Sequence, residues 1–129
     1  MTGTKADLVA YRIARAKDTY EDAVILSERE RWNSAINRLY YAAYYAVMAL
    51  LLDSNLKPIT HNGAKSKFSE HFVKPGIIDP SYGKLYSQLF TWRQKGDYDD
   101  LFDFDADKVL PYFEPVNGFI LLIEELIIK

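Results

Sequence analysis

Hydrophobic and polar residues recur along most of this chain with the spacing of α-helices. The longest apolar stretch, residues 39–52, contains no charged residue, glycine or proline, and apolar side chains recur on two of its helical faces. A helix that is apolar on more than one face is buried on more than one face. The stretch therefore predicts the central helix of a helical bundle. It is shorter than the roughly 20 apolar residues that a membrane-spanning helix needs.

Amphipathic segments on both sides of this stretch predict four further helices. The polar residues Thr4, Thr60 and Asp105 precede three of them, where a side-chain oxygen can accept a hydrogen bond from a free backbone N–H group. All five expected helices span residues 6–28, 32–54, 61–73, 80–95 and 106–128. Prolines 111 and 115 predict a broken start to the last helix. Gly96 and six aspartates between residues 97 and 107 predict a loop, since both residue types disfavour helix.

These elements predict an all-α fold, an up-and-down four-helix bundle with an additional helix, in a single domain over residues 1–129. The formal charge of -2 argues against a surface that binds nucleic acid everywhere, but it allows a local basic cleft. The chain has no cysteine, which excludes disulfides and thiolate chemistry. No apolar signal-peptide core is visible near Met1, so a cytoplasmic location is expected.

The end of the fourth predicted helix carries the clearest candidate chemistry. Arg93 falls in line with Tyr86 and Leu89 at helical spacing, so it is expected to project from the buried side of its helix. A guanidinium on the buried side of a helix needs a carboxylate, a phosphate or an aromatic ring as its interaction partner. One interpretation is a pair with Asp97, if the helix reaches that residue. The other is an anion site, where Arg93 holds a phosphate and Tyr98 or a central tyrosine stacks on a base.

Arg38 raises the same question at the start of the tyrosine-rich half of the central helix. It is either a surface arginine that pairs with an acid or a part of the same site, together with Tyr41 and Tyr45.

Other polar clusters predict no metal and no cofactor. His61 and His71 are expected to be surface or capping residues, because neither has the Glu-x-x-His spacing of a metal site in a helical bundle. The aspartate-rich loop lacks the glycine and the final glutamate of an EF-hand calcium loop.

Four short motifs, in this order, resemble the HEPN domain family, the small helical domains of prokaryotic toxin–antitoxin and nucleotidyltransferase-linked systems. The motifs are Arg38-Leu39-Tyr40-Tyr41-Ala42-Ala43-Tyr44, Thr60-His61-Asn62-Gly63, Phe72-Val73-Lys74 and Arg93-Gln94-Lys95-Gly96-Asp97-Tyr98. The resemblance implies the bundle described above and, in many members, a symmetric dimer.

The resemblance also implies an activity. Active members of the family are metal-independent ribonucleases whose arginine and histidine, in an Arg-x(4–6)-His motif, meet at a dimer cleft. Arg93 matches the arginine, but Tyr98 stands where the histidine could first fall, and no histidine follows His71. A tyrosine with a pKa of about 10 is a poor proton acceptor near neutral pH. Asp97, if paired to Arg93, would be a weak base.

The sequence therefore favours a module that binds a nucleotide, RNA or a partner protein at a cleft around Arg93. Two alternatives stay open: a metal-independent endoribonuclease toxin that uses Arg93, Asp97 and Tyr98, and a structural helical adaptor. The expected binding residues are Arg38, Tyr41, Tyr45, Arg93 and Tyr98. The expected partners are a second copy of the chain, a nucleotidyltransferase-type antitoxin and an RNA or nucleotide ligand, with no membrane. Whether the protein is an enzyme stays open.

Overall fold

The computed structural model describes residues 3–98 and 103–128, without the side chains of Tyr98 and Ile128. This described part is helical and contains no strand, which confirms the predicted all-α fold. In chain order the elements are α1 (Lys5–Glu28), α2 (Trp32–Asp53), α3 (His61–Phe68), the π-helical turn η1 (Ser69–Val73), α4 (Pro80–Tyr98), α5 (Ala106–Val109), the 3-10 turn η2 (Leu110–Tyr112) and α6 (Phe113–Ile128).

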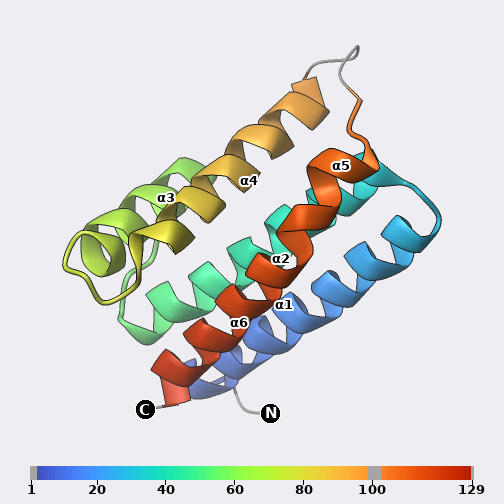
Figure 1. The fold of residues 1–129 in the computed structure, drawn as a ribbon. Coiled ribbons are helices and arrows are strands. Elements are labelled where there is room, and N and C mark those ends of the chain that lie inside the picture. The colour runs from blue at the N-terminus through green and yellow to red at the C-terminus, as the bar shows by residue number, and fades with distance from the viewer. Residues whose placement is uncertain (1–2, 99–102, 129) are drawn as a thin grey trace.

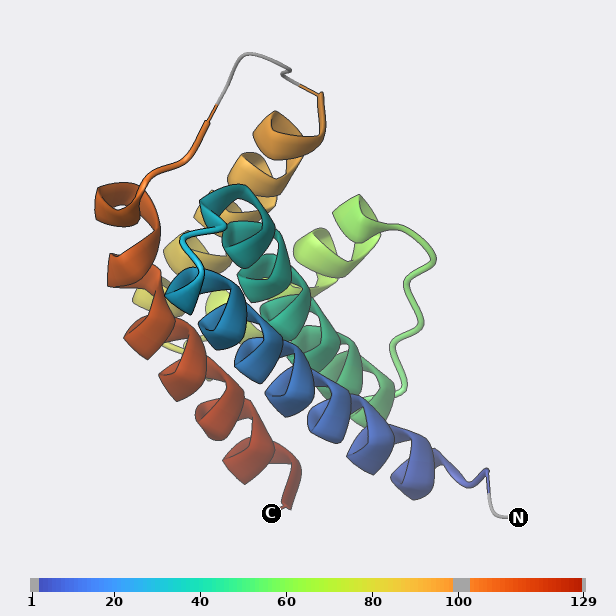
Figure 2. The same cartoon turned by 90° about the vertical axis from the view of Figure 1, so that its right-hand side faces the viewer.

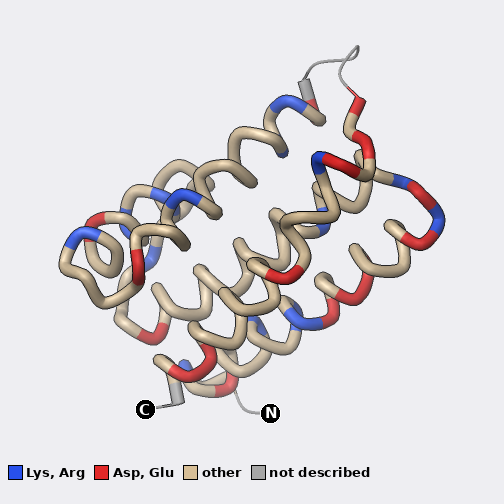
Figure 3. Tube along the Cα trace, in the orientation of Figure 1, with Lys and Arg blue, Asp and Glu red and all other residues tan. Residues whose placement is uncertain are grey.

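The long helices α1, α2, α4 and α6 run alternately up and down, and α3 is the additional helix (Figures 1 and 2). A turn of three residues joins α1 to α2, so the two helices lie antiparallel along their whole length. The predicted bundle topology is therefore confirmed. Charged residues alternate in sign through this turn and gather again before α5 (Figure 3).

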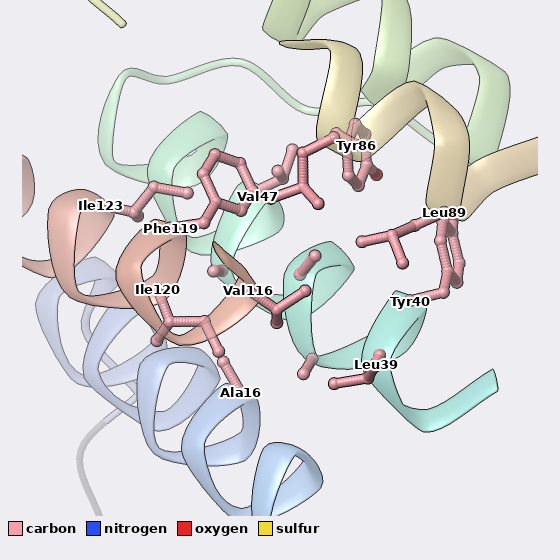
Figure 4. Packing of buried hydrophobic residues seen from close by; sticks show 14 of the residues in the cluster. Ala16, Leu39, Tyr40, Val47, Tyr86, Leu89, Val116, Phe119, Ile120 and Ile123 are labelled. Atoms are coloured by element: carbon pink, nitrogen blue, oxygen red, sulfur yellow. The ribbon is translucent and has the colours of Figure 1, made fainter. Parts of the chain in front are cut away.

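Helix α2 is the centre of the bundle, as its apolar pattern predicts. It packs against α1, α4 and α6 and also contacts α3. Figure 4 shows Val47 between Tyr86 from α4 and Phe119 from α6, and Tyr40 beside Leu89 from α4. All five side chains are at most 1% exposed.

By length and composition alone, α2 is also the one helix in the described part of the chain that could cross a membrane. The sequence argument that the apolar run is too short for this was therefore too strict. However, 67% of its most apolar window is buried inside the fold, as in the core helix of a helical bundle.

The three predicted helix caps are confirmed. The Thr4 and Thr60 hydroxyls and the Asp105 carboxylate each accept a hydrogen bond from a backbone N–H group two or three residues into the helix that follows. Proline 111 lies in the 3-10 turn η2, and Pro115 lies in the first turn of α6, where a missing N–H group breaks no helical hydrogen bond. The predicted broken start to the last helix is confirmed as well.

The predicted end of the fourth helix at Gly96 is wrong, because α4 continues to Tyr98. Packing of the helix end explains the difference. The Trp92 ring lies 5.3 Å from the ring of Phe104 and 4.9 Å from that of Tyr112. Burial of such aromatic surface outweighs the cost of about 1 kcal/mol for a glycine inside a helix. Of the predicted loop, residues 99–102 lie outside the described residues, and residues 103–105 form no regular structure.

Candidate functional site

Arg93 projects from the buried side of α4, as its position in the helical stripe predicts. Its side chain is only 12% exposed. The guanidinium carbon lies 5.1 Å from the centre of the Tyr40 ring and 6.0 Å from that of Tyr41. A cation near the faces of two aromatic rings is attracted by their quadrupoles. The arginine is thus held mainly by rings from α2.

Hydrogen bonds use little of the donor capacity of Arg93. Its Nη1 donates to the Tyr41 hydroxyl at 3.4 Å and to the Asp97 carboxylate at 3.5 Å, both long for a hydrogen bond. Its Nε is buried and has no hydrogen-bond partner among the described residues. A guanidinium has five N–H donors, and of its three nitrogens only Nη1 has a hydrogen-bond partner among the described residues.

Asp97 lies one turn beyond Arg93, because α4 reaches it. The predicted Arg93–Asp97 pair is therefore confirmed. The Asp97 side chain is 37% exposed, and ion pairs of such exposed groups contribute at most about 1 kcal/mol. The Asp97 carboxylate is close enough to offset part of the positive charge of Arg93. It does not occupy the other N–H donors of the guanidinium.

Arg38 lies one turn before Tyr41 on α2 and contacts the same ring as Arg93. Its guanidinium carbon is 5.0 Å from the centre of the Tyr41 ring. Its Nη2 and Nε donate to the side-chain oxygen of Asn37 at 2.8 and 3.1 Å, so the partner is an amide and not the predicted acid. Arg38 and Asp97 line one shallow hollow at this end of the bundle. The structure therefore brings Arg38, Tyr41 and Arg93 together.

Two of the predicted binding residues do not join this group directly. Tyr45 contacts Arg15 of α1, whose Nη2 donates to its hydroxyl at 3.0 Å, and it reaches the group only through the neighbouring Tyr41 ring, 6.1 Å away. The side chain of Tyr98 lies outside the described residues, so its predicted roles stay predictions.

His61 is the site residue that the sequence did not reveal. Its Nδ1 is 2.7 Å from the Tyr40 hydroxyl, and its ring stacks on that of Tyr44 at 4.4 Å. The expectation of a surface or capping histidine is wrong, because α3 begins directly over the tyrosines of α2. Burial, with a smaller contribution from the charge of Arg93, lowers the pKa of His61 below its usual value. The imidazole is therefore neutral near pH 7.

The Tyr40 and Tyr86 side chains lie in the core, beneath Arg93, Tyr41 and His61. Burial raises the pKa of Tyr40 and of Tyr86 well above the ordinary value, so both phenols stay protonated. The Tyr86 ring stacks on that of Tyr40 at 6.0 Å. The hydroxyl of Tyr86 lies close enough to that of Tyr40 to affect its pKa, but it makes no hydrogen bond of good geometry in the described part of the chain. Neither phenol can therefore act as a general base near neutral pH.

A larger hollow than the one beside Arg38 lies elsewhere, between α3, η1 and α4. Lys65, Lys74 and Lys84 line it together with serines and Glu70. Lys84 is solvent-exposed, and an exposed ammonium is strongly hydrated. The Arg93 guanidinium differs from these lysines, because it is withdrawn from water and only weakly bonded. Among the described residues, no three His, Asp or Glu side chains gather as metal ligands would.

The comparison with protein families agrees with the fold and the motifs. The HEPN domain matches residues 9–126. The chain belongs to the HEPN domain family. A Thermotoga maritima protein named as a UPF0332 protein is 38% identical over 95% of this chain and 93% of its own length.

Two other relatives, both from Methanocaldococcus jannaschii, carry the name "Putative toxin". One is 36% identical over 64% of this chain and 62% of its own length. The other is 31% identical over 67% of this chain and 59% of its own length.

Proposed function

We propose that this protein is a toxin-like HEPN module that binds the phosphate of a nucleotide or an RNA strand at Arg93. The observation that carries the proposal is a guanidinium that is 12% exposed and has a buried Nε without a partner. An unsatisfied buried donor costs about 1–3 kcal/mol, so packing alone does not favour arginine at this position. A phosphate would supply acceptors for the terminal nitrogens of the guanidinium, and it would reach Nε only after the side chains that cover Nε shift.

The residues around Arg93 suit the rest of a nucleotide. The Tyr41 and Tyr44 rings and the His61 imidazole are half-buried, so part of each ring is accessible to solvent. Bases stack on such aromatic side chains, each contributing about 1–3 kcal/mol to binding. The neutral imidazole adds a hydrogen-bonding group without adding charge. The cluster is thus a phosphate site beside a stacking surface.

Calorimetric titration tests the proposal. Adenosine monophosphate and a short RNA are titrated into the wild type, Arg93→Ala and Lys84→Ala. We expect Arg93→Ala to weaken binding at least tenfold, since hydrogen bonds to charged groups contribute about 1.5–3 kcal/mol. Lys84→Ala removes the same charge from the exposed side of α4 and is expected to leave the affinity within about twofold. Circular dichroism checks that each variant is folded. Equal affinity of the wild type and Arg93→Ala would remove Arg93 from the site.

His61 favours a second candidate function, a metal-independent endoribonuclease. The sequence argument against cleavage was the lack of a histidine after Arg93, and His61 brings a neutral imidazole to the same tyrosines from α3. A neutral imidazole can accept the proton of a ribose 2′-hydroxyl. Incubation of RNA with the protein in EDTA tests this. Cleavage that His61→Gln abolishes and His71→Gln keeps would support the enzyme. If the wild type does not cleave RNA, the endoribonuclease is rejected and the proposed binding module stands.

The assembly and the cellular context also remain proposals. We propose a homodimer and a nucleotidyltransferase-type antitoxin as partners, in the cytoplasm. Light scattering at micromolar concentration is expected to give the mass of two chains. A monomer mass would contradict the dimer.

A further inference from the structure

The exposed edge of α2 has an unusual composition for the surface of an acidic protein. Its half-buried positions recur at helical spacing and are occupied by Asn37, Arg38, Tyr41, Tyr44, Tyr45 and Met48. No aspartate or glutamate occurs anywhere from Trp32 to Leu52, although the whole chain carries a charge of -2. This edge therefore combines positive charge with aromatic rings and lacks negative charge of its own.

Helix α1 continues the same composition beside α2. The Nη2 of Arg15 donates to the Tyr45 hydroxyl at 3.0 Å, and its Nη1 donates to the Tyr11 hydroxyl at 3.4 Å. The guanidinium carbon of Arg15 also lies 4.8 Å from the centre of the Tyr45 ring. Arg12, one turn earlier, donates to the backbone oxygen of Met48 at 3.2 Å. Tyr11 is 57% exposed, so the outer end of this group is open to solvent.

The contacts join into one continuous strip that starts at the proposed nucleotide site. Arg93 contacts Tyr41, the Tyr41 ring lies 6.1 Å from the Tyr45 ring, and Tyr45 contacts Arg15. We call the residues Arg93, Tyr41, Tyr45, Arg15 and Tyr11 the arginine–tyrosine strip. It passes from α4 over α2 to α1, which lie side by side on this face (Figure 2).

The arginines of this face are not neutralised by the protein. No carboxylate in the described residues forms an ion pair with Arg12, Arg15 or Arg38, and Arg93 has only its long contact to Asp97. Three of these four arginines instead lie near tyrosine rings. A polyanion is the ligand whose charge complements such a surface, and its bases can stack on the accessible parts of the tyrosine rings.

We propose that the arginine–tyrosine strip binds a single-stranded polynucleotide several nucleotides long, and that Arg93 holds only one of its phosphates. Arg15 contacts a second phosphate, and Tyr45 and Tyr11 stack on bases. This inference rests on the proposed nucleotide site and extends it, since it assigns a strand and not a mononucleotide as the preferred ligand. The shared chemistry fits RNA and DNA strands, which separate arms of the test compare.

Fluorescence anisotropy with labelled oligonucleotides tests the strip. The probes are a labelled mononucleotide, a ten-nucleotide RNA and a ten-nucleotide DNA of the same sequence. The proteins are the wild type, Arg93→Ala, Arg15→Ala and Tyr45→Leu. Lys17→Ala is the matched control, because it removes one positive charge from α1 on the side that faces Glu124 of α6.

We expect the wild type to bind a ten-nucleotide strand at least tenfold more tightly than the mononucleotide. Arg15→Ala and Tyr45→Leu are expected to weaken strand binding about tenfold and to leave mononucleotide binding unchanged. Arg93→Ala weakens both, and Lys17→Ala weakens neither. The slope of log affinity against log salt is expected to fall by about 0.7 in Arg15→Ala, the value for one phosphate contact on a single strand. A preference for RNA over DNA would add contacts to the 2′-hydroxyl, and equal binding would mean recognition through phosphates and bases alone.

Three results would overturn the strip. If a ten-nucleotide strand binds no more tightly than the mononucleotide, the site ends at Arg93 and only this extension fails. If Arg15→Ala and Lys17→Ala have equal effects, the strip has no specific role. If Arg15→Ala or Tyr45→Leu converts a dimer to a monomer in light scattering, the strip is an interface between copies. Binding of neither probe by the wild type would instead overturn the proposed function itself.

Discussion

The two halves of α2 differ in burial and in chemistry: Tyr41, Tyr44 and Tyr45 of the first half are only half-buried, whereas every residue from Ala46 to Leu52 except Met48 is buried. From Ala46 to Leu52 the buried positions are all aliphatic. In the first half, Tyr40 is 0% exposed, and its hydroxyl bonds to His61. An aliphatic side chain would fill that position without a polar group to satisfy. The second half therefore fits the requirements of a core alone, whereas the first half carries groups that favour a ligand site.

The largest effect on stability is expected in the aliphatic half. Leu51 is 0% exposed, and Leu51→Ala should lower the free energy of unfolding by about 2–5 kcal/mol, because it removes apolar contacts and leaves a cavity. Chemical denaturation followed by circular dichroism measures this change. Nucleotide affinity of the folded variant should stay at the wild-type value. A loss of affinity with little loss of stability would contradict the division between the two halves.

A smaller effect is expected for the two buried phenols, and it should differ between them. Tyr40→Phe removes the hydrogen bond to His61 and should cost about 1 kcal/mol of stability. Tyr86→Phe removes a hydroxyl that makes no hydrogen bond of good geometry in the described structure and should leave the stability unchanged or raise it. Denaturation of both variants gives the comparison. Equal destabilisation would mean that the Tyr86 hydroxyl is bonded.

Asp97→Asn should change stability by less than about 1 kcal/mol, because its contact to Arg93 is long and the carboxylate is 37% exposed. The same substitution should raise nucleotide affinity a few-fold, since it removes a carboxylate that competes for Arg93. Calorimetric titration measures both affinities. Glu124→Gln, which removes a carboxylate from the other side of the bundle, is the control. Weaker binding by Asp97→Asn would instead assign this carboxylate to the ligand site.

The smallest effect concerns pH. The folded protein lowers the pKa of His61, so the unfolded chain binds the proton more readily. This contribution to stability is fully present above the unfolded value of about 6.5 and is lost as the pH falls below it. Thermal unfolding between pH 7.5 and 5 should show the loss in the wild type and in His71→Gln. His61→Gln should show less of it, and an unchanged pH dependence would contradict the burial of His61.

The local features of this fold are predictable from the sequence. Thr4, Thr60 and Asp105 cap helices because each side chain acts on N–H groups within three residues. The apolar pattern of α2 also identifies the central helix, and helical spacing places Arg93 on the buried side of α4. Such features depend only on residues that are close together in the sequence, so the sequence is enough to predict them.

Features that depend on how helices cross are harder to predict. Gly96 and the aspartates after it indicate a loop, yet packing of Trp92 on Phe104 keeps α4 helical to Tyr98. The contact between Tyr40 and His61 joins residues 21 positions apart on two helices. Only the path of the chain between α2 and α3 brings them together, and no local pattern encodes that path.

An NMR titration with adenosine monophosphate tests the ligand site most directly. Amide and side-chain resonances are followed in the wild type as the nucleotide is added. The largest shifts are expected at Arg93, His61 and the first half of α2, with little change from Ala46 to Leu52. Shifts confined to the lysine-lined hollow between α3 and α4, or no shifts at millimolar nucleotide, would contradict a nucleotide site at Arg93.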